Sequence, residues 1–172
     1  MIQHLIPISA LALVLLLSGC GAQTPMPGSQ EPEGATTVET TFTVDTPIQT
    51  VMDDPAFGDY GRLLFPTDDG YWSGETLGDL RLTFYSHIDP SETVEIVNTL
   101  KERALAGETI FYDIYTDEEK AADPDKEDTG LFFFKGEPGA RFAVCNAGGA
   151  FAYVGAMHDS FPHALELSQQ SY

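Results

Sequence analysis

Basic side chains are scarce in this chain, which has 8 Lys and Arg residues against 27 Asp and Glu residues. The resulting net charge of -19 makes a surface that repels nucleic-acid phosphates and anionic lipid headgroups. We therefore exclude nucleic acid as a partner. None of this charge lies in the first 19 positions, which contain no Asp, Glu, Lys or Arg.

The uncharged N-terminus contains an apolar run over residues 8–17, which is interrupted only by Ser9. A permanent membrane helix needs about 20 apolar residues, so a run this short is typical of a signal-peptide core. No Lys or Arg precedes it, and His4 is the residue nearest to a basic one there. We expect a signal peptide over residues 1–19; a buried helix is the alternative.

The apolar run ends in Leu17-Ser18-Gly19-Cys20. This tetrapeptide resembles the lipobox of bacterial lipoproteins. The resemblance implies that a diacylglycerol is attached to the sulfur of Cys20 and that the leader is cleaved before this residue. Two acyl chains make a stable anchor. We therefore expect membrane lipid to hold the chain through Cys20 at the extracytoplasmic face of the cell membrane.

Cysteine occurs only at Cys20 and Cys145, so a lipidated Cys20 would leave Cys145 without a disulfide partner in the chain. Cys145 ends an apolar run over residues 142–145, and no basic residue stands beside it to activate a thiolate. A free cysteine in such a run behaves as a small buried hydrophobe. We expect Cys145 to pack in the core.

Apolar residues are also sparse over residues 21–47, which are rich in Pro, Gly, Thr, Ser and Glu. Such a composition cannot bury enough surface to offset chain entropy. We expect lipidated Cys20 and a flexible acidic linker over residues 20–50. Aromatic residues become dense from about Asp53, and we expect one folded domain over residues 51–172.

Local patterns predict a mixture of helices and strands in this domain. Residues 80–85 alternate like a half-buried strand, and Asp-Pro-Ser-Glu at 89–92 opens a helix that Gly107 ends. Further strands are predicted over residues 109–115, 131–135 and 141–145, each bounded by Gly, Pro or an acidic turn. The predicted apolar face of the helix consists of Val94, Val97, Leu100, Ala104 and Leu105.

An acidic segment, residues 117–128, separates the first two of these three strands. Asp123, Asp125 and Glu127 have ligand chemistry for calcium, but the segment lacks the glycine and the twelfth-position glutamate of a calcium loop. We interpret it as the solvated loop of a hairpin. No metal ligand and no cofactor are expected in this chain.

The sequence Asn-Ala-Gly-Gly-Ala-Phe-Ala-Tyr-Val-Gly at 146–155 follows the last predicted strand and precedes a predicted helix. Small residues between a strand and a helix let backbone N–H groups face an anion without obstruction. The pattern therefore predicts a cradle for an oxyanion. A turn that needs small residues only for packing is the alternative.

This stretch resembles the esterase and lipase branch of the α/β-hydrolase superfamily, in which the third strand is followed by an H-G-G-G-aromatic loop. The resemblance covers residues 109–172. Ala147 matches the family's His or Pro, Gly148, Gly149 and Ala150 match the three glycines, and Phe151 matches the aromatic residue. The resemblance implies that Gly148, Gly149 and Ala150 form the oxyanion hole, with Gly149 and Ala150 as N–H donors.

The same resemblance implies an α/β fold class: the N-terminal strands and first crossover helix of an incomplete α/β-hydrolase-like sheet, with Ser160 capping the helix. Two positions depart from the family pattern. Ala147 cannot anchor the loop as a histidine would, and Ala150 hinders any positive φ that the turn requires.

Catalytic residues of the family follow this loop as a G-x-S-x-G elbow, then an acid, then a histidine. No serine here has Gly two residues before and after it, and Ser73 in Gly-Tyr-Trp-Ser-Gly comes before the strands. His158, Asp159 and Ser160 are neighbours in a helix entrance and cannot align as a triad. We expect a chain truncated before its nucleophile and inactive alone, whose complete form would take a small ester substrate.

A second function fits the same composition. A small acidic surface lipoprotein could bind a ligand or a partner without catalysis. Its contacts would then be exposed aromatic side chains in the first half of the domain: Tyr71, Trp72, Phe84 and Tyr85.

Overall fold

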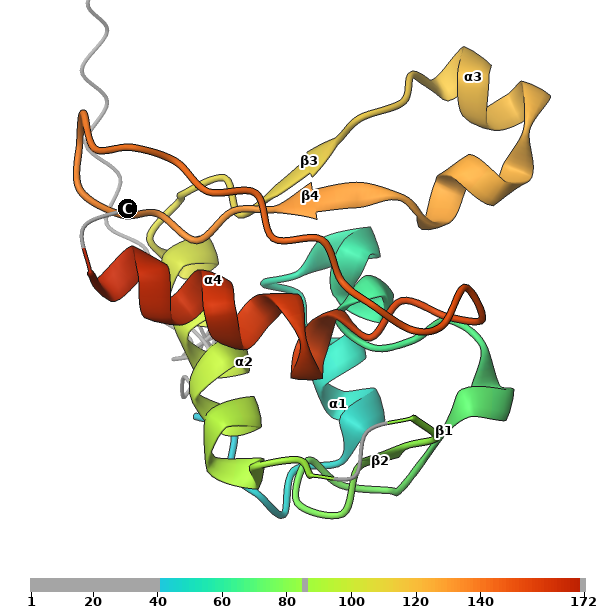
Figure 1. The fold of residues 1–172 in the computed structure, drawn as a ribbon, viewed down its shortest axis with the longest axis vertical. Coiled ribbons are helices and arrows are strands. Elements are labelled where there is room, and N and C mark those ends of the chain that lie inside the picture. The colour runs from blue at the N-terminus through green and yellow to red at the C-terminus, as the bar shows by residue number, and fades with distance from the viewer. Residues whose placement is uncertain (1–40, 85–86, 171–172) are drawn as a thin grey trace, which may run out of the picture. The chain divides into compact units, whose positions relative to one another are not determined.

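Helix α2 (Pro90–Leu105) is the longest helix in the computed structural model, which describes residues 41–84 and 87–170 (Figure 1). The carboxylate of Asp89 accepts the Ser91 N–H at 2.9 Å, which caps the helix, and Gly107 follows its end with a φ of 79°. The predicted helix is confirmed. The residues that begin and end this helix lie next to it in the sequence, and they have the roles that the sequence predicted.

The buried face of α2 differs from the predicted one. Leu105 is 52% exposed, and Val94 and Ala104 are only half-buried. The core side of the helix is instead made by Thr93, Ile96, Val97 and Leu100. Thr93 is buried because its hydroxyl donates to the Asp89 carbonyl at 3.2 Å, which satisfies its polar group inside the helix.

The chain before α2 packs against this helix from residue 42 onward. Phe42 is buried, and its N–H and carbonyl bond the Asn98 side-chain amide at 2.9 and 3.0 Å. Helix α1 (Ile48–Met52) and the 3₁₀ helix η1 (Gly58–Leu64) follow. Residues 42–50, which the sequence assigned to the linker, therefore contribute to the core. Cys20, the predicted leader and the linker up to residue 40 lie outside the described residues.

Two antiparallel sheets of two strands each are formed by the described residues. Strand β1 (Trp72–Ser73) follows the 3₁₀ helix η2 (Asp69–Tyr71) and pairs with β2 (Arg81–Leu82). Strand β3 (Phe111–Asp113) pairs with β4 (Gly130–Phe132) in a hairpin. Both β2 and the hairpin strands are shorter than predicted.

The segment 141–145 was predicted to be a strand, but it has no strand partner in the described structure. Its side chains are correspondingly less buried than expected: Phe142 is 87% exposed, Val144 is 65% exposed and Cys145 is half-buried. The expectation that Cys145 packs in the core is therefore wrong. A strand needs a hydrogen-bonded partner, and none of the described residues forms backbone hydrogen bonds with this segment.

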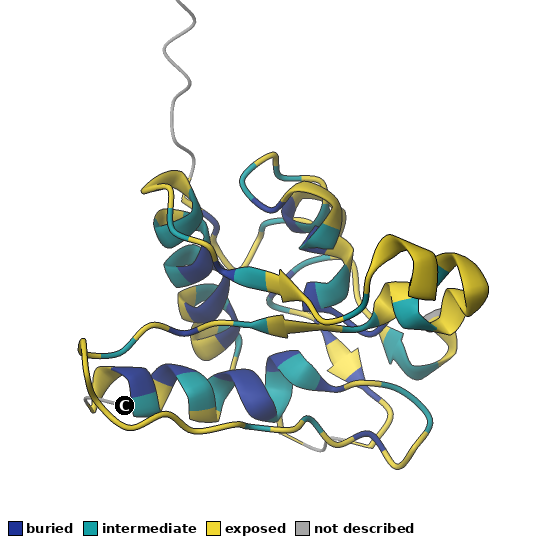
Figure 2. Ribbon diagram, turned by 90° about the horizontal axis from the view of Figure 1, so that it is seen from above, coloured by how far each residue is buried: buried dark blue, intermediate teal, exposed yellow. Residues whose placement is uncertain are grey.

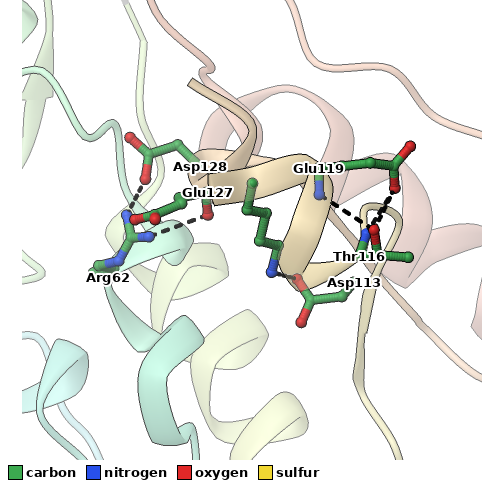
Figure 3. Close-up of polar contacts among 7 residues, drawn as sticks. Arg62, Asp113, Thr116, Glu119, Glu127 and Asp128 are labelled. Atoms are coloured by element: carbon green, nitrogen blue, oxygen red, sulfur yellow. Dashed lines mark hydrogen bonds and ion pairs between the residues drawn. The ribbon is translucent and has the colours of Figure 1, made fainter. Parts of the chain in front are cut away.

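The acidic segment between β3 and β4 is exposed, as predicted, but it is helical rather than a loop. Helix α3 (Asp117–Ala122) and the 3₁₀ helix η3 (Pro124–Asp128) form the tip of the hairpin (Figures 1 and 2). Thr116 and Glu119 start α3 with a capping box, in which each side chain bonds the backbone N–H of the other (Figure 3).

Ion pairs attach this tip to the rest of the domain. Lys120 on α3 pairs with Asp113 on β3, and Arg62 on η1 pairs with Asp128 on η3 (Figure 3). Arg62 also donates to the carbonyl of Glu127 at 3.2 Å. Because Arg62 and Asp128 are about half exposed, their pair orients the tip more than it stabilises the fold.

The C-terminal helix α4 (Ser160–Gln169) follows the 3₁₀ helix η4 (Ala156–His158) and packs against α2 (Figure 1). Its N-cap is Asp159 rather than the predicted Ser160, and neither side chain caps the helix. The core shared by α1, α2, α4 and the segments between them consists of Phe42, Ile48, Val51, Phe57, Leu64, Phe65, Leu77, Leu80, Ile96, Val97, Leu100, Ile110, Phe134, Met157, Phe161 and Leu165.

The predicted α/β-hydrolase-like sheet requires a crossover to a parallel strand after α4. The described residues combine helices with two small antiparallel sheets, so this crossover stays a prediction. None of the described helices is both long enough and apolar enough to cross a bilayer.

Candidate functional site

The glycine-rich loop, residues 146–155, closes on itself through backbone hydrogen bonds. The Gly155 N–H donates to the Gly148 carbonyl and the Ala152 N–H to the Gly149 carbonyl, both at 2.9 Å. Gly149 has a φ of 147°, and a Cβ there would lie 1.8 Å from the carbonyl oxygen of Tyr153. Only glycine fits this position, so the sequence pattern reflects a steric requirement.

The two residues after Gly149 have left-handed backbone conformations. Ala150 has a φ of 54° and Phe151 a φ of 61°. For residues with a Cβ, this conformation costs roughly 1–2 kcal/mol each. The sequence indicated that an alanine at position 150 would hinder a positive φ. Ala150 nevertheless adopts one, and the hydrogen bonds of the surrounding loop hold it in this conformation.

The backbone N–H groups of this loop divide into two sets. The Gly148 N–H donates to the carboxylate of Asp159. The N–H groups of Gly149, Ala150 and Phe151 donate to no backbone or side-chain acceptor among the described residues. Of the three predicted oxyanion residues, Gly148 is already bonded to a carboxylate. The N–H groups of Gly149, which is buried, and of Ala150, which is exposed, have no acceptor among the described residues.

His158 joins the end of this loop to helix α2. Its Nε2 lies 3.4 Å from the hydroxyl oxygen of Thr93, whose single hydrogen is donated to the Asp89 carbonyl. The tautomer with the ring proton on Nε2 satisfies both contacts of the Thr93 hydroxyl. The Nδ1 atom is buried and has no partner in the described part of the chain. Burial lowers the pKa of His158 to about 4, because removal of the ring from water disfavours its protonated, charged form.

Each side chain of the sequence 158–160 contacts a different part of the domain. His158 contacts Thr93 on α2, Asp159 bonds the Gly148 N–H, and Ser160 is buried at the start of α4. The three side chains share no hydrogen bond with one another. In the described structure these three side chains are not arranged as a nucleophile, base and acid in line.

A groove of about 850 Å³ lies beside the loop. We call residues 130–137, which include β4, the first arm, and residues 140–147, which lead into the loop, the second arm. Both arms line the groove, as do α4 residues that include Phe161, Ala164 and Leu167. Figure 2 shows α4 running alongside the two extended arms. No sequence prediction included this groove; the two-residue spacing of Phe142 and Val144 is the feature that could have indicated it.

The aromatic residues proposed as partner contacts pack against different parts of the domain. Tyr71 stacks on Tyr153 of the loop, with ring centroids 5.3 Å apart, and the half-exposed Phe84 stacks on the same ring at 5.8 Å. Trp72 instead packs on Phe65 at 6.4 Å. Tyr85 lies outside the described residues. Tyr71 and Phe84 therefore support the loop through Tyr153, which no sequence pattern had indicated as a member of this cluster.

Comparisons of the chain with protein-family models, with curated proteins and with solved structures find no match. Within the described residues, no group of three or more His, Cys, Asp and Glu side chains is placed to hold a metal ion.

The steric role of Gly149 gives a first prediction. Gly139→Ala introduces a Cβ with nothing within 4 Å at a φ of 81°, so it should cost about 1 kcal/mol of unfolding free energy. Gly149→Ala adds a clash with the Tyr153 carbonyl and should cost at least about 2 kcal/mol more. Urea denaturation of the two variants measures the difference, and equal losses would contradict the described loop geometry.

The buried ring of His158 gives a second prediction. Its pKa is about 4 in the folded chain and near 6.5 in the unfolded chain, so the unfolded chain takes up the proton first. The unfolding free energy should therefore fall as the pH drops from about 6.5 to about 4, by up to about 3 kcal/mol. His158→Gln removes this contribution, while carboxylate effects common to both proteins cancel in the comparison.

Urea midpoints measured across this pH range test the His158 prediction. The stability difference between wild type and His158→Gln should shrink toward acidic pH. His163→Gln, at an exposed position of α4, is the matched control and should run parallel to wild type. A difference between wild type and His158→Gln that does not change with pH would show that the ring is not held neutral.

Proposed function

We propose that this domain is the oxyanion-binding portion of a carboxylic ester hydrolase of the α/β-hydrolase type, held at the membrane by lipid on Cys20. One observation carries the proposal: Gly149 and Ala150 present adjacent N–H groups without acceptors, on a tight loop ahead of helix α4. Two such donors can bond the oxygen of a tetrahedral intermediate. Loss of one such donor typically lowers kcat by about 10²–10³.

The loop has an anchor that compensates for the alanine at position 147. In the family pattern, a histidine at this position helps to hold the loop. Here the Asp159 carboxylate accepts the Gly148 N–H, and the Gly155 N–H closes the loop onto the Gly148 carbonyl. These bonds fix Gly148 from both sides, which supports a pre-organised cradle rather than a loose turn.

Ester hydrolysis also needs a nucleophile, a base and an acid. No G-x-S-x-G sequence occurs among the 172 residues, and His158 contacts Thr93 rather than a serine. The attacking serine would therefore have to come from residues outside this sequence. The domain would contribute the stabilisation of negative charge, and the rest of the catalytic set would be supplied elsewhere.

The catalytic half of the proposal makes a third prediction. The full 172-residue chain should not hydrolyse a short-chain aryl ester above the blank rate, because it holds no activated serine. Release of the aryl alcohol is followed by absorbance, with and without an organophosphate serine inhibitor. Inhibitor-sensitive turnover would overturn the assignment of the nucleophile to residues outside the chain.

Genomic sequence provides the complementary test of the family assignment. If the DNA after codon 172 continues, in any frame, into a strand followed by G-x-S-x-G, the hydrolase proposal gains its missing part. If it continues into unrelated sequence, the proposal fails, and the glycine-rich loop is a packing turn.

The membrane anchor is tested separately as a fourth prediction. In a bacterial host, the wild-type chain should incorporate labelled palmitate and sediment with membranes, because two acyl chains give stable anchoring. Cys20→Ser should abolish both the label and the sedimentation. Cys145→Ser is the matched control and should retain both. Label that persists in Cys20→Ser would contradict lipidation at this residue.

A lipoprotein that binds a partner without catalysis is the second candidate function. The exposure of Phe142 and Val144 on an unpaired extended segment favours it. The two candidates use different parts of the molecule, the loop in one case and the two arms in the other.

A further inference from the structure

The two arms beside the groove have unused backbone hydrogen-bonding capacity. Within the described structure, residues 141–147 take part in no backbone–backbone hydrogen bond. On the first arm, β4 pairs with β3, and the Phe133 N–H extends that pairing to the Ile110 carbonyl at 2.8 Å. Beyond Phe133 the pairing ends, and residues 134–136 make no backbone–backbone hydrogen bond among the described residues.

Apolar side chains accompany these open backbone edges. Leu131 and Phe133 on the first arm are 45% and 41% exposed, and Phe142 and Val144 on the second arm are more exposed still. Both pairs have the two-residue spacing of a β-strand face. Extended backbone with open edges and alternating apolar side chains is a template for the addition of a strand.

We propose that an extended peptide strand from another polypeptide docks in this groove and pairs its backbone with the two arms, above helix α4. The strand would take up the N–H and carbonyl groups of residues 141–147 and cover Phe142 and Val144. The proposal does not depend on ester hydrolysis, because it concerns the arms and not the N–H groups of the loop.

The unpaired backbone favours a peptide over an acyl chain. Any occupant of the groove displaces water from the amides of the arms. An acyl chain cannot replace those hydrogen bonds, and each buried amide left unsatisfied costs about 1–3 kcal/mol. A peptide strand replaces them directly.

Charge favours a different polypeptide over a second copy of this chain. Two copies, each with a net charge of -19, repel one another. The arms are an exception to this acidity, because residues 130–147 contain Lys135 and Arg141 but only one acid, Glu137. Lys135 pairs with Glu108 at 2.7 Å, whereas Arg141 is exposed and makes no ion pair or hydrogen bond within the described residues. A carboxylate on the incoming strand fits Arg141.

The experiment uses the full chain and a fluorescently labelled, capped peptide, Glu-Val-Thr-Val-Thr-Val-Glu. Its valines share one face, and its terminal glutamates place an acid near Arg141 in either strand direction. We expect saturable binding by fluorescence anisotropy. A peptide of the same sequence, N-methylated at alternate residues, should bind at least about tenfold more weakly, because it has lost about half of its donors.

Variants of the chain locate the site. Val144→Asp should weaken binding at least about tenfold, by placing an acid in the apolar contact. Arg141→Ala should weaken it about threefold, the loss of one exposed ion pair. Ile114→Asp, at a position 57% exposed and outside the groove lining, is the matched control and should bind like wild type. The N-methylated peptide keeps the test valid even if a variant unfolds.

Several results would overturn the proposal. Equal binding of the N-methylated peptide would mean that the backbone is not paired. Failure of the parent peptide to bind would mean that the groove does not accept an extended strand. Binding of dodecanoate in place of the peptide would mean that an acyl chain is the occupant. A concentration-dependent dimer in light scattering that Val144→Asp dissociates would mean that a second copy occupies the site.

Discussion

The pair of residues that precedes helix α4 holds the glycine-rich loop to the rest of the domain. His158 reaches Thr93 on the buried face of α2, and Asp159 bonds the Gly148 N–H. These two contacts face different elements, so the packing of α4 on α2 determines where the loop lies. The available N–H groups of the loop are therefore fixed by side chains that are not part of it, as pre-organised sites in general require.

The sequence predicted several features that depend on near neighbours along the chain, although it missed helix α3, whose capping box of Thr116 and Glu119 is also local. Helix α2 has its cap, its proline and its terminal glycine in order, and Gly149 is required by a carbonyl only four residues away. Features that depend on distant contacts were missed. Phe42 enters the core because of Asn98, and no local pattern could reveal that pairing.

The strand predicted at 141–145 failed for a related physical reason. Its apolar composition is suited to a sheet, but a strand exists only with a hydrogen-bonded neighbour. The same absence explains why Cys145 is half-buried and why Phe142 faces solvent. The composition of this segment indicates that it can pair as a strand, but the described structure contains no partner for it. The unpaired segment instead lines the groove.

Three of the few basic residues connect separate parts of the domain through ion pairs. Lys101 pairs with Asp54 at 2.9 Å, where both side chains are mostly buried, and so ties α2 to the turn after α1. Arg62 and Lys120 orient the hairpin tip through more exposed pairs. Two exposed arginines, Arg81 and Arg141, have no partner acid within the described residues, and Arg81 donates to the Leu80 carbonyl instead. Arg141 lies on the second arm, whose backbone N–H and carbonyl groups have no backbone partner among the described residues. The positive charge and the unpaired backbone groups therefore favour the same segment as the place where an external strand pairs.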